Sequence, residues 1–595
     1  MHTFHIPVMG LAYTIDSPVK VARFGISSVI SIIEDRLIEM MRGVYYKQIG
    51  ETYHPISTKE TDYRARRITD YLNLVNRIVQ SQMEQLRTLA FEKGSEIIKY
   101  FEMLPPGSPL KQLYVQMNNT GSAAERSKLI SRLRALMRSG SIDVNIMTKT
   151  DKNNYNEHGQ LIEDGSDAVA ALRGYVNSDL RDSSIVFSAG MNPRLYNYME
   201  KCPQFNADED GNFRKKVIVK VSDFRSALIQ GKYLAKKGIW VSEFRIESGI
   251  NCGGHAFPSE GYLMGPILEE FKSRRQELTD VLFELYNPAL KNKGLKTFKY
   301  APRLIISAQG GIGTAMEDTL LHNYYGIDST GWGTPFLLVP EATTVDEVTL
   351  NMLCRAEQKD VVLSHHSPMG VRFHYLKGSS AEKERLARIE SGKPGSPCTE
   401  KHLSFNTEFT EQPICTASRQ YQKLKIKQLQ SLVLPKEDYQ AQLQKVLEKE
   451  CLCIGLSNAA AINYDTEFVK HQQAVNICPG PNIAWFNKEV SLQGMTDHIY
   501  GRTSILGDNG RPHMFLAELK LYLDYITEQL EEGNNKDKLK YYNSFCINIA
   551  EGINYYRRLA EEAIITYPAF LAGLNEHEHR LSQVKERIQW YRSNY

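Results

Sequence analysis

Short apolar segments recur through the first 340 residues at the spacing of an alternating strand and helix fold. The stretches between them, such as residues 226–237 and 264–285, are long enough for a helix that returns the chain to the same edge of a sheet. Strands connected in this way run parallel, and eight of them predict a closed (β/α)₈ TIM barrel, an α/β fold. An open doubly wound sheet would give the same local pattern. The expected strands are residues 5–9, a second within 13–33, then 142–147, 184–188, 216–221, 240–245, 304–308 and 329–338.

The remaining segments predict an insertion and two appendages to this barrel. Apolar residues at helical spacing in 62–104 and 127–137 predict a helical insertion over about 60–137. The strand pattern ends near Pro368, and a stretch rich in Gly, Ser and Lys at 378–397 is expected to be a surface connection. Helical spacing returns at 419–452 and from 514 onward. We therefore divide the chain into a barrel (1–368), a cysteine-bearing extension (369–500) and a mostly helical C-terminal region (501–595), as expected for 595 residues.

Composition excludes several classes of protein. A formal net charge of +3 on 595 residues gives no reason to expect a nucleic-acid partner. The N-terminal residues lack the pattern of a secretory signal, and the early apolar run at 24–33 is too short to span a membrane. Nine cysteines, an odd number, fit a reducing compartment better than a disulfide framework. We expect a cytoplasmic protein without a membrane partner, and the sequence leaves open whether it forms a homo-oligomer.

Glycines at two expected strand ends suggest a phosphate site. The segment 302–342 runs from an apolar strand into Gly310 and Gly311, then through a helix to a second strand with Gly333 and Thr334. In a parallel barrel these positions lie on one face, where backbone N–H groups and a helix N-terminus can bind an anion that a Cβ would hold away. Taken alone, the GGIG sequence is equally typical of a tight structural turn.

The sequence of this segment, AQGGIGT followed by YGIDSTGWGTPFLLVPEA, resembles the flavin phosphate-binding end of the nitronate monooxygenase (2-nitropropane dioxygenase) family. It is similar also to the related flavin-dependent enoyl-acyl-carrier-protein reductases. The resemblance extends over roughly residues 5–345 and implies a bound FMN. Gln309 and Pro335 depart from the family's pattern, although Gln309 is counted among the cofactor-binding residues. The residues that the resemblance assigns to FMN are Met9, Gly10, Asn145, Lys220 (or Ser222 beside it), Gly253, Gly254, Gln309, Gly310, Gly311, Gly333 and Thr334.

The segment ESGINCGGHAF carries the expected catalytic residue. It resembles the family's glycine-glycine-histidine turn, which implies that His255 lies over the substrate. A histidine after two glycines at a strand end is also chemically suited to remove a proton next to a nitro or carbonyl group. A histidine that only binds a loop is the alternative. Cys252 lies three residues before His255, and a packing role is favoured for it over a reactive one.

Cysteines in turn-rich surroundings mark the extension. Thiolates grouped in this way are typical ligands of an iron–sulfur cluster or a structural zinc ion. Their spacing is not diagnostic, and buried free cysteines are the simpler alternative. The five candidates are Cys398, Cys415, Cys451, Cys453 and Cys478.

Together these features predict an FMN-dependent oxidoreductase of the nitronate monooxygenase type, acting on a small molecule or acyl thioester with an acidic C–H or a conjugated double bond. Three alternatives remain open at this stage. One is an enoyl-thioester reductase that uses NAD(P)H, and another is a flavin and iron–sulfur protein that exchanges electrons with a carrier. The third is a barrel isomerase without flavin that binds a phosphorylated substrate at the same glycines.

Overall fold

A computed structural model describes residues 2–147, 151–156, 158–252, 260–507, 510–532 and 536–594. Eight parallel strands close into a barrel in the order β1 to β8, which confirms the predicted (β/α)₈ fold. Side chains alternate along each strand, so Val29, Val186 and Ile218 form a small cluster apart from the main core. The strands are β1 (Phe4–Ile6), β2 (Ser27–Ser31), β3 (Ile142–Ile146), β4 (Ser183–Phe187), β5 (Lys215–Val221), β6 (Glu243–Glu247), β7 (Ile305–Gln309) and β8 (Ser329–Gly331).

Three predicted strand bounds were wrong, and one of them is the end of β1, which lies at Ile6 rather than at residue 9. The last strand was expected to reach residue 338, but β8 ends at Gly331 and the chain turns into a 3₁₀ helix, η4 (Thr334–Leu338). Pro335 lies at the start of this helix and has no N–H to donate to a strand ladder. β6 begins at Glu243 rather than at residue 240, and Trp240 and Val241 pack in the core ahead of it.

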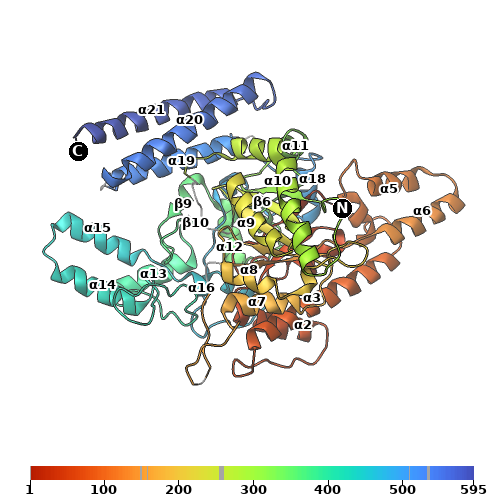
Figure 1. Ribbon diagram of the computed structural model, residues 1–595, viewed down its shortest axis with the longest axis horizontal. Helices are drawn as coiled ribbons and strands as arrows, with labels where there is room; N and C mark the ends of the chain where they lie inside the picture. Colours follow the sequence, from red (N-terminus) through yellow and green to blue (C-terminus); the bar gives the residue numbers. More distant parts are fainter. Residues whose placement is uncertain are drawn as a thin grey trace.

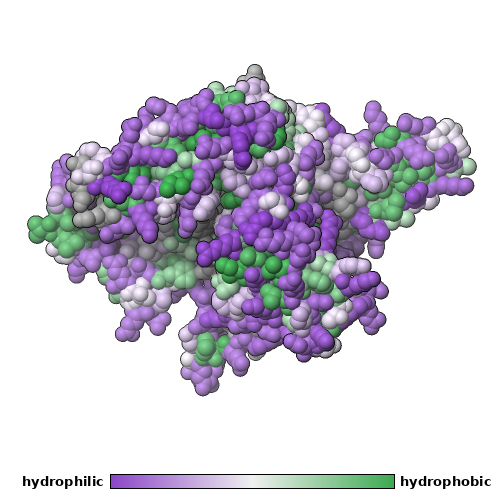
Figure 2. Space-filling model, turned by 45° about the horizontal axis from the view of Figure 1, so that its top comes forward, coloured by the Kyte–Doolittle hydropathy of each residue, from purple (hydrophilic) through white to green (hydrophobic). Residues whose placement is uncertain are grey.

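Helices surround the barrel. Those that follow or connect its strands are α1 (Ser17–Val21), α2 (Asp35–Gln48), α7 (Asp167–Val176), α8 (Pro193–Met199), α9 (Phe224–Lys236), α10 (Met264–Asn292), α11 (Ala315–Asn323) and α12 (Glu347–Arg355). Among the helices that the structure describes, none is long and apolar enough to cross a membrane. The visible surface is mostly hydrophilic, with apolar residues in small groups (Figure 2).

The predicted helical insertion lies between β2 and β3. It consists of α3 (Tyr63–Thr88), α4 (Glu96–Met103), α5 (Pro109–Asn119) and α6 (Ala123–Leu136). The sequence analysis missed α5, whose start is set by Pro109 and by the Ser108 hydroxyl that accepts from the Lys111 N–H. Figure 1 shows α5 and α6 at one end of the molecule's long axis and α14 and α15 at the other.

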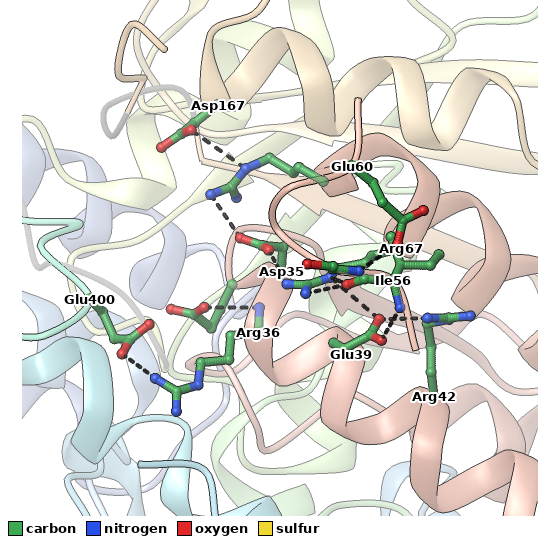
Figure 3. Close-up of polar contacts among 12 residues, drawn as sticks. Asp35, Arg36, Glu39, Arg42, Ile56, Glu60, Arg67, Asp167 and Glu400 are labelled. Carbon is green, nitrogen blue, oxygen red and sulfur yellow. Dashed lines mark hydrogen bonds and ion pairs between the residues drawn. The ribbon is translucent and has the colours of Figure 1, made fainter. Parts of the chain in front are cut away.

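Ion pairs join α2 to the insertion and to the extension, and those at Asp35 are buried (Figure 3). Arg64 and Arg67 of α3 each lie 2.8 Å from the Asp35 carboxylate at the start of α2. Arg42 of α2 is 2.6 Å from Asp70 of α3. Arg36, at the surface of α2, pairs at 2.9 Å with Glu400 of the extension. Because Arg64 and Arg67 are almost fully buried, the Asp35 carboxylate is needed to compensate the positive charge of their guanidinium groups.

The extension continues the core of the barrel. A hairpin of β9 (Val361–Ser364) and β10 (Phe373–Leu376) spans the expected boundary at Pro368, so the division of the chain into three parts stays a prediction. The expected surface connection at 378–397 was wrong in its first half, which forms α13 (Ser380–Glu390) because Ser379 caps a run of strong helix formers. The expected helix at 419–452 is broken before Pro435 into α14 (Arg419–Ser431) and α15 (Lys436–Leu447). The remaining helices are α16 (Leu452–Gly455), α17 (Asn458–Asn463), α18 (Leu492–Ile499), α19 (Met514–Glu531), α20 (Leu539–Glu561) and α21 (Phe570–Asn594).

Candidate functional site at the barrel mouth

Polar side chains meet where the strands end. Asn145, Lys220 and Gln309, all predicted from the sequence, lie at or beside the C-terminal ends of β3, β5 and β7. Lys220 Nζ and Gln309 Nε2 both donate to Oε1 of Glu247, at 2.9 and 2.7 Å. Asn251 Nδ2 donates to the same oxygen at 2.8 Å. The sequence analysis missed Glu247, although a charged residue that ends an apolar strand is a usable signal.

Asn145 has an unsatisfied acceptor. Its side chain is buried, and its Oδ1 has no hydrogen-bond partner among the described residues. A buried acceptor without a donor costs about 1–3 kcal/mol. The arrangement is therefore suited to a bound molecule that presents an N–H or O–H group at the mouth of the barrel.

A second set of unsatisfied groups lies at the ends of β7 and β8. Gly310 and Gly311 have φ angles of +110° and +77°, which glycine adopts without strain. A Cβ on Gly311 would come within 2.1 Å of Ile250, so the loop after β6 depends on its absence. The backbone N–H groups of Gly310, Gly311 and Gly333 donate to no other residue in the described ranges. Donors of this kind at adjacent strand ends suit an anion.

The N-terminus of α11 is, in contrast, satisfied by the chain itself. The Glu317 carboxylate accepts from the N–H groups of Gly313 at 2.8 Å and Thr314 at 3.1 Å. Arg511 pairs with Glu317 at 2.8 Å and donates to the Gly311 carbonyl at 2.6 Å. Burial favours the neutral acid, but the Arg511 charge and the hydrogen bonds outweigh it and lower the pKa of Glu317. This network was not apparent in the sequence.

The extension packs over the same face of the barrel. The Thr334 hydroxyl donates to the Pro479 carbonyl at 2.7 Å, and Asn482 Nδ2 donates to the Ile312 carbonyl at 3.0 Å. Met9 is buried in the core, and a Cβ on Gly10 would approach the Tyr13 ring to 2.9 Å. Thr334 is therefore covered by the extension, and Met9 and Gly10 pack against protein.

The predicted catalytic turn, with Gly253, Gly254 and His255, lies outside the described residues. The two flanks of this turn are joined by Glu518 of α19, which accepts from the Ser248 hydroxyl at 2.9 Å and the Met264 N–H at 2.7 Å. Burial raises the pKa of Glu518 to about 7. Burial also raises the pKa of Cys252 well above its usual value, which keeps this thiol protonated and disfavours it as a nucleophile.

Among the five candidate metal ligands, Cys478 lies apart from Cys398 and Cys415. Cys398 and Cys415 pack together with Ala417, whereas Cys478 packs with Phe373, Tyr375 and Leu452. A hydrogen bond from the Cys415 thiol lowers the pKa of Cys398 to about 6. A hydrogen bond from the Cys453 thiol likewise lowers the pKa of Cys451.

Comparisons with known proteins assign no family. No protein-family model and no curated protein matches the sequence. Among solved structures, the chain is similar to the enoyl reductase domain of MlnA from the macrolactin biosynthesis cluster of Bacillus amyloliquefaciens, with 15% identity and a TM-score of 0.32 over 67% of this chain and 85% of that one. It is similar also to nitroalkane oxidase from Streptomyces ansochromogenes, with 13% identity and a TM-score of 0.28 over 64% of this chain and 86% of that one. These likenesses are too distant to assign an activity.

Proposed function

We propose that this chain is an FMN-dependent oxidoreductase of the nitronate monooxygenase type. The observation that carries the proposal is the pairing, at one barrel mouth, of unsatisfied amides at the ends of β7 and β8 with the unsatisfied Asn145 Oδ1 at the end of β3. The first set suits a phosphate and the second suits a polar edge of a ring. Both belong to residues that the sequence resemblance assigns to FMN.

The residues present fit the cofactor. Gly310, Gly311 and Gly333 would hold the phosphate through N–H groups that no other described residue occupies. Asn145 Oδ1 would accept from the ring system, and Lys220 would offer its ammonium group. FMN, when bound, would supply the redox chemistry, and the protein would bind and orient it.

Glu247 would fix the orientation of the ring-facing donors. Its carboxylate binds both Lys220 and Gln309, so each side chain is held in one rotamer before a ligand arrives. Preorganised donors lose less entropy on binding than free ones. The extension would exclude water from the same space, since residues 476–482 cover the ends of β7 and β8.

His255 is the proposed base. It would remove the proton from a carbon next to an electron-withdrawing group, while Glu518 anchors both flanks of its loop. The substrate is proposed to be a small molecule or acyl thioester with an acidic C–H or a conjugated double bond. Reduction of an enoyl thioester by NAD(P)H is the alternative outcome of the same site.

Two assays on FMN-loaded protein separate these outcomes. Oxygen consumption that depends on an alkyl nitronate would support the monooxygenase, and NAD(P)H oxidation that depends on an enoyl thioester would support the reductase. His255→Ala should lower kcat for the nitronate by about 100-fold or more, as expected for loss of a general base. His158→Ala, at an exposed position, is the matched control and should leave the rate unchanged. If FMN-loaded protein shows neither activity, the proposed function is wrong.

A further inference from the structure

Two turn segments of the extension bring a pair of cysteines together. Ser396 forms a parallel bridge with Ser418, and its N–H donates to the Ala417 carbonyl at 2.9 Å. This bridge holds the segment of Cys398 beside the segment of Cys415, and the Cys415 thiol donates a hydrogen bond to the Cys398 sulfur. Both side chains are buried in one small cluster.

A second pair of cysteines lies against the first. Cys451 caps the start of α16 and Cys453 lies within that helix, so the CxC sequence becomes a contact in which the Cys453 thiol donates to the Cys451 sulfur. The Ser396 hydroxyl lies within hydrogen-bonding reach of Cys451 and so links the two pairs. Cys451 also interacts electrostatically with Cys398 and Cys415. Four thiols that span 56 positions of the sequence therefore form one group.

The surroundings of this group suit thiolate ligands. The Ser404 hydroxyl lies 3.9 Å from the Cys398 sulfur, and the Lys401 N–H also donates to it. Lys152, from the connection after β3, interacts electrostatically with Cys398 and Cys415 of the first pair and with Cys453 of the second. Hydrogen-bond donors and a cation around sulfur ligands stabilise the negative charge of a metal–thiolate centre. The first pair borders an open cavity of about 710 Å³, which provides a path for entry.

The spacing of the thiols distinguishes between two kinds of centre. Zinc with four thiolates has Zn–S bonds of about 2.3 Å, so its sulfurs lie roughly 3.8 Å apart. No three of these four sulfurs, all of which belong to described residues, lie within 4.8 Å of one another. The thiols instead form two close pairs with a wider separation between the pairs. A centre that contains several metal ions fits this arrangement better than a single ion does.

We propose that Cys398, Cys415, Cys451 and Cys453 bind an iron–sulfur cluster. The site is independent of FMN, and it differs from the five-residue set expected from the sequence because Cys478 packs in another cluster. It lies near the rim of the barrel. Cys453 interacts electrostatically with Glu34, the residue that caps α2 after β2, and Lys152 follows β3, the strand that ends beside Asn145.

The test is reconstitution of the full chain with ferrous iron and sulfide under anaerobic conditions, followed by metal, sulfide and mass analysis. We expect about two irons and two sulfides per chain, because each close pair of thiols would bind one iron of a two-iron cluster. Zinc bound without sulfide would contradict the cluster. Two disulfides in a metal-free protein, seen as a loss of four hydrogens in the mass, would also contradict it.

Matched variants assign the ligands. Cys398→Ser and Cys453→Ser should each lower bound iron several-fold, whereas Cys354→Ser, at a half-buried position on α12, should retain it. Circular dichroism shows whether each variant is folded, and iron is compared only between folded proteins. Full iron content in folded Cys398→Ser and Cys453→Ser would overturn the assignment. FMN binding, measured in the same samples, should be unchanged, which separates failure of this site from failure of the flavin proposal.

Discussion

Two neighbouring sets of backbone amides at the end of β7 differ in whether other residues bind them. The N–H groups of Gly313 and Thr314 are bound by Glu317, which Arg511 holds in place. Those of Gly310 and Gly311, only a few residues earlier, bind no other described residue. A glycine-rich motif therefore does not by itself identify which amides are available to a ligand. The chain completes the first set for stability and leaves the second set open.

The largest expected effect comes from breaking the ion pair between Arg511 and Glu317, which holds the Gly313 and Thr314 amides. Arg511→Met removes one partner of a pair whose side chains are only 5% and 2% exposed, and leaves the Glu317 carboxylate buried without its cation. We expect the free energy of unfolding to fall by about 3–5 kcal/mol. Denaturant unfolding would measure this loss.

The double variant Arg511→Met/Glu317→Gln is the control for this effect. It removes the uncompensated charge, so it should recover part of the lost stability. If Arg511→Met alone were as stable as the wild type, the ion pair would not be what holds the Gly313 and Thr314 amides in place.

Glu518 is a buried carboxyl group that joins the two flanks of the loop after β6, and its contribution to stability depends on pH. Its pKa is about 7 in the folded protein and about 4.5 when unfolded, so the folded state binds the proton more tightly. The stability that its protonated form contributes is complete below about pH 4.5, is lost between about pH 4.5 and 7, and is absent above that. The loss amounts to roughly 3 kcal/mol.

Unfolding of the wild type and Glu518→Gln at pH 4.5 and pH 8 isolates this loss. Other groups titrate equally in both proteins, so the variant should gain stability relative to the wild type by that amount at pH 8. Glu551→Gln, at an exposed position, should show no such change. A pH-independent difference between wild type and Glu518→Gln would show that this carboxyl does not titrate with a raised pKa.

The open set of amides should discriminate between ligands with and without a phosphate. We expect FMN to bind roughly 100-fold more tightly than riboflavin, because charge-assisted hydrogen bonds from the Gly310, Gly311 and Gly333 amides add about 2.7 kcal/mol. Titration calorimetry of the apoprotein with each flavin measures the ratio. Equal affinities would mean that the phosphate does not occupy these strand ends.

Asn145→Ala should give the smallest effect on folding. Because Oδ1 has no partner among the described residues, its removal should change the free energy of unfolding of the cofactor-free protein by less than about 1 kcal/mol. Its loss should weaken FMN binding by roughly 5- to 10-fold. A large loss of stability without any effect on FMN binding would mean that Asn145 supports the fold and does not contact the cofactor.

The sequence predicted the barrel because each strand is a short apolar run with its own turn signals. The resemblance to the flavin family singled out Asn145, Lys220 and Gln309, and the structure places all three at or beside strand ends. The sequence analysis missed Glu247, Glu317, Arg511 and Glu518, whose roles depend on contacts across long stretches of chain; Arg511 lies 194 residues from Glu317. The helix α13 was missed because the Gly and Ser residues around it outweighed its own helix formers in a local reading.

Identification of the cofactor tests the central claim most directly. Protein purified from cells, or the apoprotein incubated with FMN, would be denatured and the released small molecules identified by mass. The account expects about one FMN per chain, with a lower content in Asn145→Ala. A folded protein that releases no FMN and does not bind added FMN would contradict it.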